Sequence, residues 1–158
     1  MRFASARSFA SSGAFYWFHA ANRQNEVHGM ITGIKITQAE ARRDKDEDMT
    51  GLNVNIGLDA VTVKGGEVEI AFNYSVIYTE GVGELKMKGT ITSKEDAKLT
   101  KEITAKWEKE KKLPDGFAEI ILNAINYACG TNGVFVARPV NLSPPIVPPK
   151  IQLGQQSQ

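Results

Sequence analysis

Residues 67–78 read EVEIAFNYSVIY, and this stretch decides the fold. Apolar side chains occupy every second position, and charged or small polar residues stand between most of them. A period of two is typical of a β-strand that has one buried and one solvated face. The apolar positions are Val68, Ile70, Phe72, Tyr74, Val76 and Tyr78. The stretch therefore predicts a long strand in a sheet with one apolar face.

Three further strands are predicted on either side of it. The turn Lys64-Gly65-Gly66-Glu67 favours a hairpin with the preceding strand, in which apolar residues alternate from Leu52 to Leu58. Residues 34–40 predict an earlier strand, and residues 84–92 predict a later one after the segment 80–83. The mixed charges of residues 42–48 predict a solvated loop. Short connections imply antiparallel pairing of consecutive strands, because parallel crossovers need a dozen or more residues.

The period lengthens after residue 92, which predicts two helices. Ser93 is the expected N-cap of a charged helix that ends near Lys112 and carries a narrow apolar stripe of Leu99, Ile103 and Trp107. Pro114 breaks this helix, and a second helix begins at Pro114 or Asp115. Its end is expected near Gly130 and Gly133. Its broad apolar face consists of Phe117, Ile120, Ile121, Ala124, Ile125 and Ala128.

A proline-rich segment follows the second helix. The prolines after the helix favour an extended, polyproline-like path. They are Pro139, Pro144, Pro145, Pro148 and Pro149, interleaved with Leu142, Ile146, Val147 and Ile151. The predicted fold class is therefore α+β, a four-stranded antiparallel sheet followed by two helices and this segment. The domain is expected to span residues 30–151, with residues 152–158 as a disordered tail.

Residues 1–29 lie outside this pattern. Arginines and serines dominate them, Glu26 is their single acid, and Phe15-Tyr16-Trp17-Phe18 is a short aromatic run. Three interpretations remain open: translation that begins at Met30, a disordered extension, or a targeting peptide without an A-x-A-like cleavage site. The segment is excluded from the fold argument.

Composition indicates one globular domain. Apolar residues make up 42% and charged residues 23% of the 158 residues, and the net charge is +1. Because no basic run stands clear of acidic residues, a nucleic-acid partner is not expected. No apolar run predicts insertion into a membrane. The single cysteine, Cys129, cannot form an internal disulfide, and we expect a reducing, cytoplasmic location.

The sequence offers no catalytic signature in its predicted domain. Both histidines, His19 and His28, precede residue 30, which removes the usual general base and metal ligand from the domain. Asp44, Asp46 and Asp48 alternate, but the glycine and distal glutamate of an EF-hand are absent. Cys129 has no basic neighbour that would favour the thiolate, so we interpret it as a buried structural thiol. We expect neither an enzyme nor a cofactor.

The C-terminal half resembles the SecB family of protein-export chaperones. The likeness lies in AEIILNAINYAC (residues 118–129), GVF (133–135) and PVNLSPPI (139–146), and it extends over residues 30–151 as sheet followed by helices. The resemblance implies an ATP-independent holdase that binds unfolded polypeptide clients in apolar grooves and assembles as a dimer or tetramer. The peptide-binding residues it implies are Phe135, Val136, Val140, Leu142 and Ile146, with Phe72, Tyr74 and Tyr78 from the sheet.

The sequence departs from the SecB pattern in two places. The charged helix of residues 95–112 has no counterpart of that length, and prolines and glutamines replace the acidic C-terminal helix that is associated with docking to SecA. Coupling to SecA is therefore doubtful. The alternative function is an oligomeric adaptor that binds one specific folded partner.

The width of the second helix's apolar face also predicts a homo-oligomer. A single sheet has one apolar side, and surplus apolar area on a soluble protein tends to become an interface. The expected interface residues are Phe117, Ile121, Ala124, Ile125 and Ala128.

Overall fold

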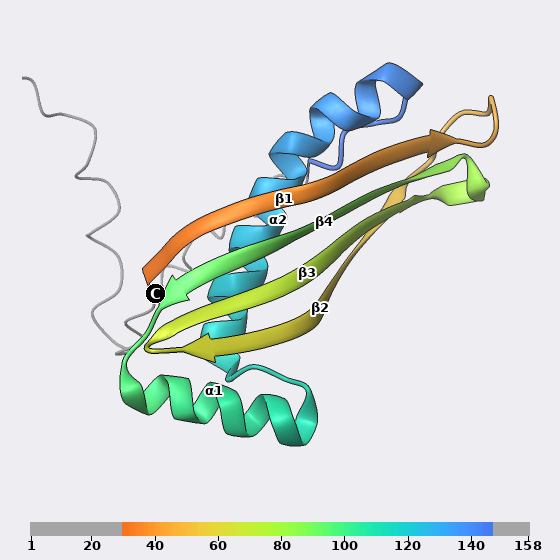
Figure 1. Cartoon of the computed structure of the whole chain (residues 1–158). Helices are drawn as coiled ribbons and strands as arrows, with labels where there is room; N and C mark the ends of the chain where they lie inside the picture. The colour runs from red at the N-terminus through yellow and green to blue at the C-terminus, as the bar shows by residue number, and fades with distance from the viewer. Residues whose placement is uncertain (1–29, 147–158) are drawn as a thin grey trace, which may run out of the picture.

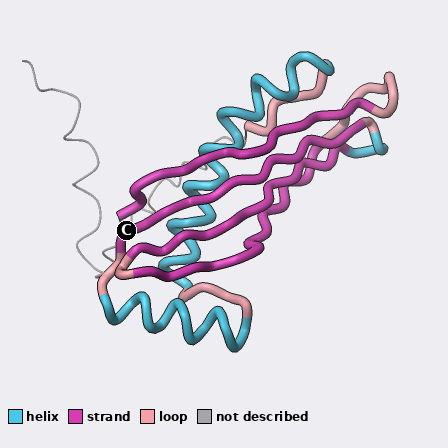
Figure 2. The backbone as a smooth tube through the Cα atoms, viewed as in Figure 1, coloured by secondary structure: helices cyan, strands magenta, loops and turns pink. Residues whose placement is uncertain are grey.

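The structure is a computed structural model, and it describes residues 30–146. The predicted extension (1–29) and tail (152–158) lie outside the described residues. The chain forms four strands, β1 (Met30–Arg43), β2 (Leu52–Lys64), β3 (Glu67–Tyr78) and β4 (Gly83–Lys94), followed by two helices, α1 (Ala97–Glu110) and α2 (Asp115–Ala137). Short 3-10 turns cover Thr79–Gly81 and Arg138–Val140. Figures 1 and 2 show α2 running behind one twisted sheet and α1 beside the edge formed by β2, and Ile103 of α1 packs in the same core as the buried residues of α2. The predicted α+β class is confirmed.

The two central strands, β3 and β4, provide most of the core. Every second residue of β3 is completely buried, as the alternation predicted, and β4 shows the same pattern. Phe72 lies opposite Gly89 across the two strands. A Cβ atom at position 89 would stand 2.8 Å from Phe72 Cζ, so the ring occupies the space that glycine leaves free. Polar side chains on the other face remain in solvent.

The strand order differs from the order of the chain. The sheet runs β1-β4-β3-β2, so β1 pairs with β4 and lies at the opposite edge from β2. All three pairings are antiparallel. The hairpin at Gly65 and Gly66 is confirmed, with φ angles of 56° and 86° that favour glycine. The connection from β1 to β2 is hydrogen-bonded to the turn between β3 and β4. The amides of Asp44 and Lys45, in the first connection, donate to the carbonyl of Val82, in the second.

Helix α1 starts later than predicted. Asp96, and not Ser93, is the N-cap, because its Oδ1 accepts hydrogen bonds of 2.8 Å from the amides of Lys98 and Leu99. Ser93 belongs to β4 instead, where it is buried. The predicted stripe faces the protein: Ile103 is completely buried and packs with the core, while Leu99 and Trp107 are half-buried.

Helix α2 starts where predicted but does not end at its glycines. It continues to Ala137 and crosses the sheet diagonally, and Figure 1 shows its last turns reaching past β1. Gly130 and Gly133 face inward because another segment lies against them. A Cβ atom on Gly133 would stand only 2.6 Å from Pro145 Cγ, and one on Gly130 would stand 3.3 Å from the Pro145 carbonyl oxygen. These glycines are contact points inside a helix rather than a helix end.

The apolar character of α2 fits a core helix. Residues 115–140 are long and apolar enough to cross a bilayer by length and composition alone. A buried stripe nevertheless runs the whole length of the helix at intervals of about four residues and faces the sheet. Its members are Phe117, Ile121, Ile125, Cys129, Gly130, Gly133 and Ala137. Burial against the rest of the chain accounts for this stripe, and 33% of the most apolar window of the helix is buried.

Candidate apolar binding site

The segment after α2 turns back and lies along the helix and the sheet. Asn141 adopts a left-handed conformation (φ 54°), which reverses the chain. The Leu142 amide then donates to the Ala137 carbonyl at 3.1 Å, and the Tyr78 hydroxyl donates to the Ser143 carbonyl. Pro145 rests against the glycines of α2. Residues 141–146 form no helix or strand and are held at both the helix and the sheet.

An open hollow of about 530 Å³ lies between this segment, the end of α2 and the β1–β2 connection. We name it the α2 hollow. Met49, Val134 and Leu142 supply its apolar surface, and they come from three parts of the chain that are distant in sequence. The complete lining is Met49, Val134, Arg138, Asn141, Leu142, Ser143 and Pro144.

One arginine holds the walls of the α2 hollow together. The Arg43 guanidinium donates to the Asn141 carbonyl at 2.6 Å and to the Glu47 carbonyl at 2.9 Å. It also pairs with Asp46 at 3.5 Å. Because these bonds join the β1–β2 connection to residues 141–146, they fix the mouth of the hollow at the end of β1.

Large apolar side chains are exposed beside the hollow and along α2. Tyr127 and Phe135 are each 76% exposed, and Ile146 is 61% exposed. Phe135 is turned away from the core, since it lies about half a helical turn from Gly133 and Ala137, which face inward. Exposed apolar side chains are typical of surfaces that bind other molecules, and these three lie on α2 and in the segment that follows it.

The structure separates the predicted peptide-binding residues into three groups. Phe72, Tyr74 and Tyr78 are buried in the core, so no client can touch them in this state, although Tyr78 positions the segment at Ser143. Leu142 lines the α2 hollow, and Val136 and Val140 are half-buried near it. Phe135 and Ile146 are exposed. The alternation of β3 identified apolar residues but could not separate core from surface.

The predicted oligomer interface is largely inside the subunit. Phe117, Ile121 and Ile125 are at most 1% exposed and face the sheet of the same chain, so they are not available to a second subunit. Ala124 and Ala128 are half-buried and border the outward face of α2. That outward face carries Tyr127, which the sequence reasoning did not single out. Of the predicted set, the two alanines are the residues near the surface.

Sequence reasoning also missed the residues that close the α2 hollow. Met49 follows the charged loop of residues 44–48, and Val134 stands next to the more conspicuous Phe135. A lone methionine between Asp48 and Thr50 was the available signal, because a charged loop in solvent has no need of one. Val134 had no comparable signal.

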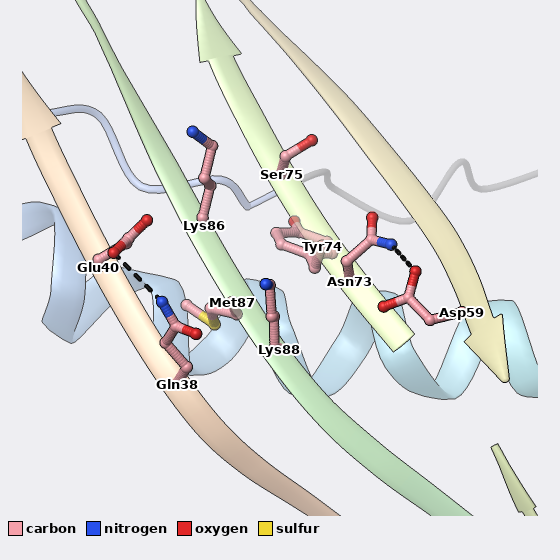
Figure 3. A pocket seen from close by; sticks show the side chains of 9 residues that line it. All are labelled: Gln38, Glu40, Asp59, Asn73, Tyr74, Ser75, Lys86, Met87 and Lys88. Atoms are coloured by element: carbon pink, nitrogen blue, oxygen red, sulfur yellow. Dashed lines mark hydrogen bonds between the residues drawn. The ribbon is translucent and has the colours of Figure 1, made fainter. Parts of the chain in front are cut away.

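The opposite face of the sheet holds a second, polar hollow of about 550 Å³ (Figure 3). Figure 3 shows Lys86 and Lys88 of β4 between Gln38 and Glu40 of β1 on one side and Asn73 of β3 on the other. The Asn73 amide donates to Asp59, and Lys86 pairs with Glu84 at 2.7 Å. Charges of both signs balance across the strands, as expected for a solvated sheet face.

Two buried titratable groups, Cys129 and Tyr74, are protonated, and neither lines the α2 hollow. Burial raises the pKa of Cys129 to about 11 and that of Tyr74 to about 12, so both are neutral at physiological pH. Within residues 30–146, no group of three His, Cys, Asp or Glu side chains is placed to hold a metal ion. Asp44 instead pairs with Arg42 at 2.6 Å. The hollow offers apolar contact from Met49, Val134 and Leu142, next to the polar residues Arg138, Asn141 and Ser143.

A comparison with solved structures defines the class of fold. The chain is similar to a SecB-like chaperone of Mycobacterium tuberculosis in complex with a ChAD peptide from the HigA1 antitoxin. The TM-score is 0.52, the sequences are 11% identical, and the match covers 79% of this chain and 91% of that one. The fold is thus distantly SecB-like. No protein-family model matches the chain, and no curated protein is similar to it.

Proposed function

We propose that this protein is a SecB-like, ATP-independent chaperone that binds non-native polypeptides in a reducing, cytoplasmic compartment. The observation that carries the proposal is the α2 hollow, whose apolar surface comes from Met49, Val134 and Leu142. Ile146, four residues after Leu142, is exposed and adds a further apolar side chain. Unfolded polypeptides expose apolar side chains, and an open apolar hollow binds them without chemistry and with little sequence specificity.

Two further observations support polypeptide as the ligand. The solved SecB-like chaperone with a similar fold is in complex with a peptide of another protein. Leu142, Ser143 and Pro144 also form one wall of the hollow without helix or strand, and an extended ligand can follow such a wall. Both fit a linear polypeptide better than a compact small molecule.

The experiment is an aggregation assay without nucleotide. Light scattering of a chemically unfolded protein, diluted into buffer, should fall when the chaperone is present at equimolar subunits. Undiminished scattering at a several-fold excess would contradict the proposal. Addition of ATP should change nothing, because the proposed mechanism is passive binding.

A specific adaptor is the second candidate, since the similar chaperone binds a peptide of one particular partner. Size-exclusion chromatography separates the two candidates. A general chaperone co-elutes with several unrelated unfolded polypeptides, whereas an adaptor co-elutes with none of them.

The proposed assembly is a homo-oligomer, with the outward face of α2 as its interface. Tyr127 lies at its centre and Ala124 and Ala128 at its border. Replacement of Tyr127 by Asp should lower the mass measured by light scattering after chromatography and leave the helix content unchanged. An unaltered mass would exclude this face.

A further inference from the structure

Helix α1 is attached to the sheet by a narrow contact. Its completely or nearly buried side chains are Thr100 and Ile103, and most of the rest of its surface is charged. Against the sheet it packs mainly on β2, near the hairpin end (Figure 1). An isolated helix of 14 residues is marginal in water, so α1 depends on this contact to stay folded.

The contact between α1 and β2 is incompletely filled. A hollow of about 290 Å³ opens between them, lined by Val61, Thr62, Val63, Thr104, Trp107 and Glu108. Trp107 is half-buried here, and the Lys111 ammonium lies 5.7 Å from its ring centroid on the solvent side. Unfilled space removes dispersion contacts from its lining, which weakens the attachment of the helix.

A buried carboxylate further weakens the junction between β4 and α1. Glu95 is 8% exposed, it makes no ion pair within the described residues, and the Ser93 hydroxyl is the side chain whose hydrogen bond favours its charged form. Its amide donates to the Gly66 carbonyl at 2.9 Å, which fixes it between the hairpin turn and the helix. A buried, unpaired charge costs free energy that release of the helix would recover.

Protonation relieves this cost. Burial raises the pKa of Glu95 above its usual range, the Asp96 charge adds to the shift, and the Ser93 hydroxyl opposes it. Four further charged groups near this junction are exposed and make no ion pair with Glu95 within the described residues: Lys64 and Glu67 of the hairpin turn, Lys94 of β4 and Lys98 of α1. A raised carboxyl pKa means that the closed junction is more stable in acid and loses stability as pH rises through that pKa.

The surface beneath α1 suits an extended polypeptide. Val61 and Val63 of β2 are half-buried and face the helix side. Within the described sheet β2 pairs with β3 alone, so its other edge presents unpaired main-chain groups. An extended segment with apolar residues at alternate positions could pair with this edge and place its side chains where Trp107 and Ile103 now lie.

We propose that α1 is a displaceable lid, and that the strip of β2 beneath it is a second binding surface for an extended apolar segment of the client. The inference rests on the proposed function and adds to it a site separate from the α2 hollow. Glu95 keeps the lid weakly closed at neutral pH, so that a client can displace it.

The free protein tests the lid through amide hydrogen exchange, read in residues 97–110 against residues 115–137. In the wild type α1 should exchange faster than α2, and its protection should fall as the pH rises through the raised pKa of Glu95, once intrinsic rates are corrected. Glu95→Gln should slow the exchange of α1 and abolish this pH dependence. The control Glu102→Gln changes an exposed carboxylate of the same helix and should match the wild type. Equal exchange in Glu95→Gln and wild type would overturn the inference.

The client arm uses reduced, carboxymethylated α-lactalbumin as a permanently unfolded polypeptide. Its binding should increase exchange in α1 and protect residues 60–64, and Ile103→Ala, which loosens the lid, should strengthen the protection. If the polypeptide binds and α1 exchange does not rise, the lid is wrong while the proposed function stands. If it does not bind at all, the proposed function fails, and the second surface fails with it.

Discussion

Helices α1 and α2 pack against one sheet, yet the sheet holds them very differently. Helix α2 crosses all four strands with a buried stripe along its full length, whereas α1 meets mainly the edge strand β2 and buries Ile103 and Thr100. Both helices show apolar residues at intervals of about four. The comparison teaches that spacing identifies the inward face, while the strand beneath determines how firmly a helix is held.

The largest expected loss of stability comes from weakening the contact between α2 and the sheet. Ile121 is completely buried at the centre of its stripe, so Ile121→Ala should lower the free energy of unfolding by about 2–5 kcal/mol. Urea denaturation followed by circular dichroism measures the change. The matched control Asn123→Ala lies on the exposed face and should stay within about 0.5 kcal/mol of the wild type. Similar losses in both variants would contradict the assigned orientation of α2.

The contact between α2 and the proline segment should be the next most sensitive. Gly133→Val places methyl groups where Pro145 rests, and overpacking of this kind costs about 1–3 kcal/mol. Thermal unfolding should show a lower midpoint, and residues 141–146 should exchange their amides faster. Gly116→Ala, at an exposed position in the first turn of the same helix, is the control and should not destabilise. A stabilising Gly133→Val would mean that the segment does not pack there.

A charge in the α2 hollow should weaken client binding without unfolding the protein. Met49→Asp introduces a carboxylate into its apolar lining, and we expect affinity for an unfolded polypeptide to fall about tenfold, or about 1.4 kcal/mol. Fluorescence anisotropy of a labelled polypeptide gives the affinity. Asn55→Asp adds the same charge to an exposed position of β2 and should bind like the wild type. Unaltered affinity in Met49→Asp would show that the client does not bind in the α2 hollow.

The smallest effect should be confined to α1. Asp96→Ala removes the cap that accepts two amide hydrogen bonds, which costs about 0.5–2 kcal/mol of helix stability. Because α1 opens separately from the core, hydrogen exchange should accelerate in residues 97–110 and not in residues 115–137. Equal acceleration in both helices would show that they unfold as one unit and would remove the contrast between them.

Local patterns in the sequence predicted the parts of the fold that depend on local chemistry. The alternation of residues 67–78, the glycine turn at residues 65–66 and the start of α2 near Pro114 all follow from neighbours in the chain. The pairing of β1 with β4 does not, because no nearby residue records which edge a strand will join. The predicted end of α2 was wrong for the same reason. Gly133 is typical of a helix end, and only the long-range contact with Pro145 explains a glycine at this position inside the helix.

The candidate site was harder to predict than the fold. Leu142, Phe135 and Ile146 were identified from the resemblance, but Met49 and Arg43 join the site only through long-range contacts. Phe72, Tyr74 and Tyr78 were expected in the site from the same resemblance, but they are large and apolar, which are the properties that send side chains into a core. Burial is decided by which helix crosses which strand, and the sequence of one strand does not contain that information.

The most direct test of the account is site-specific photocrosslinking to an unfolded polypeptide. A photoreactive phenylalanine analogue at Val134, in the α2 hollow, should crosslink to reduced, carboxymethylated α-lactalbumin, and excess unlabelled polypeptide should compete. The same probe at Glu119, exposed near the other end of α2, should give little product. Equal crosslinking at both positions, or none at Val134, would contradict the claim that this apolar hollow holds the client.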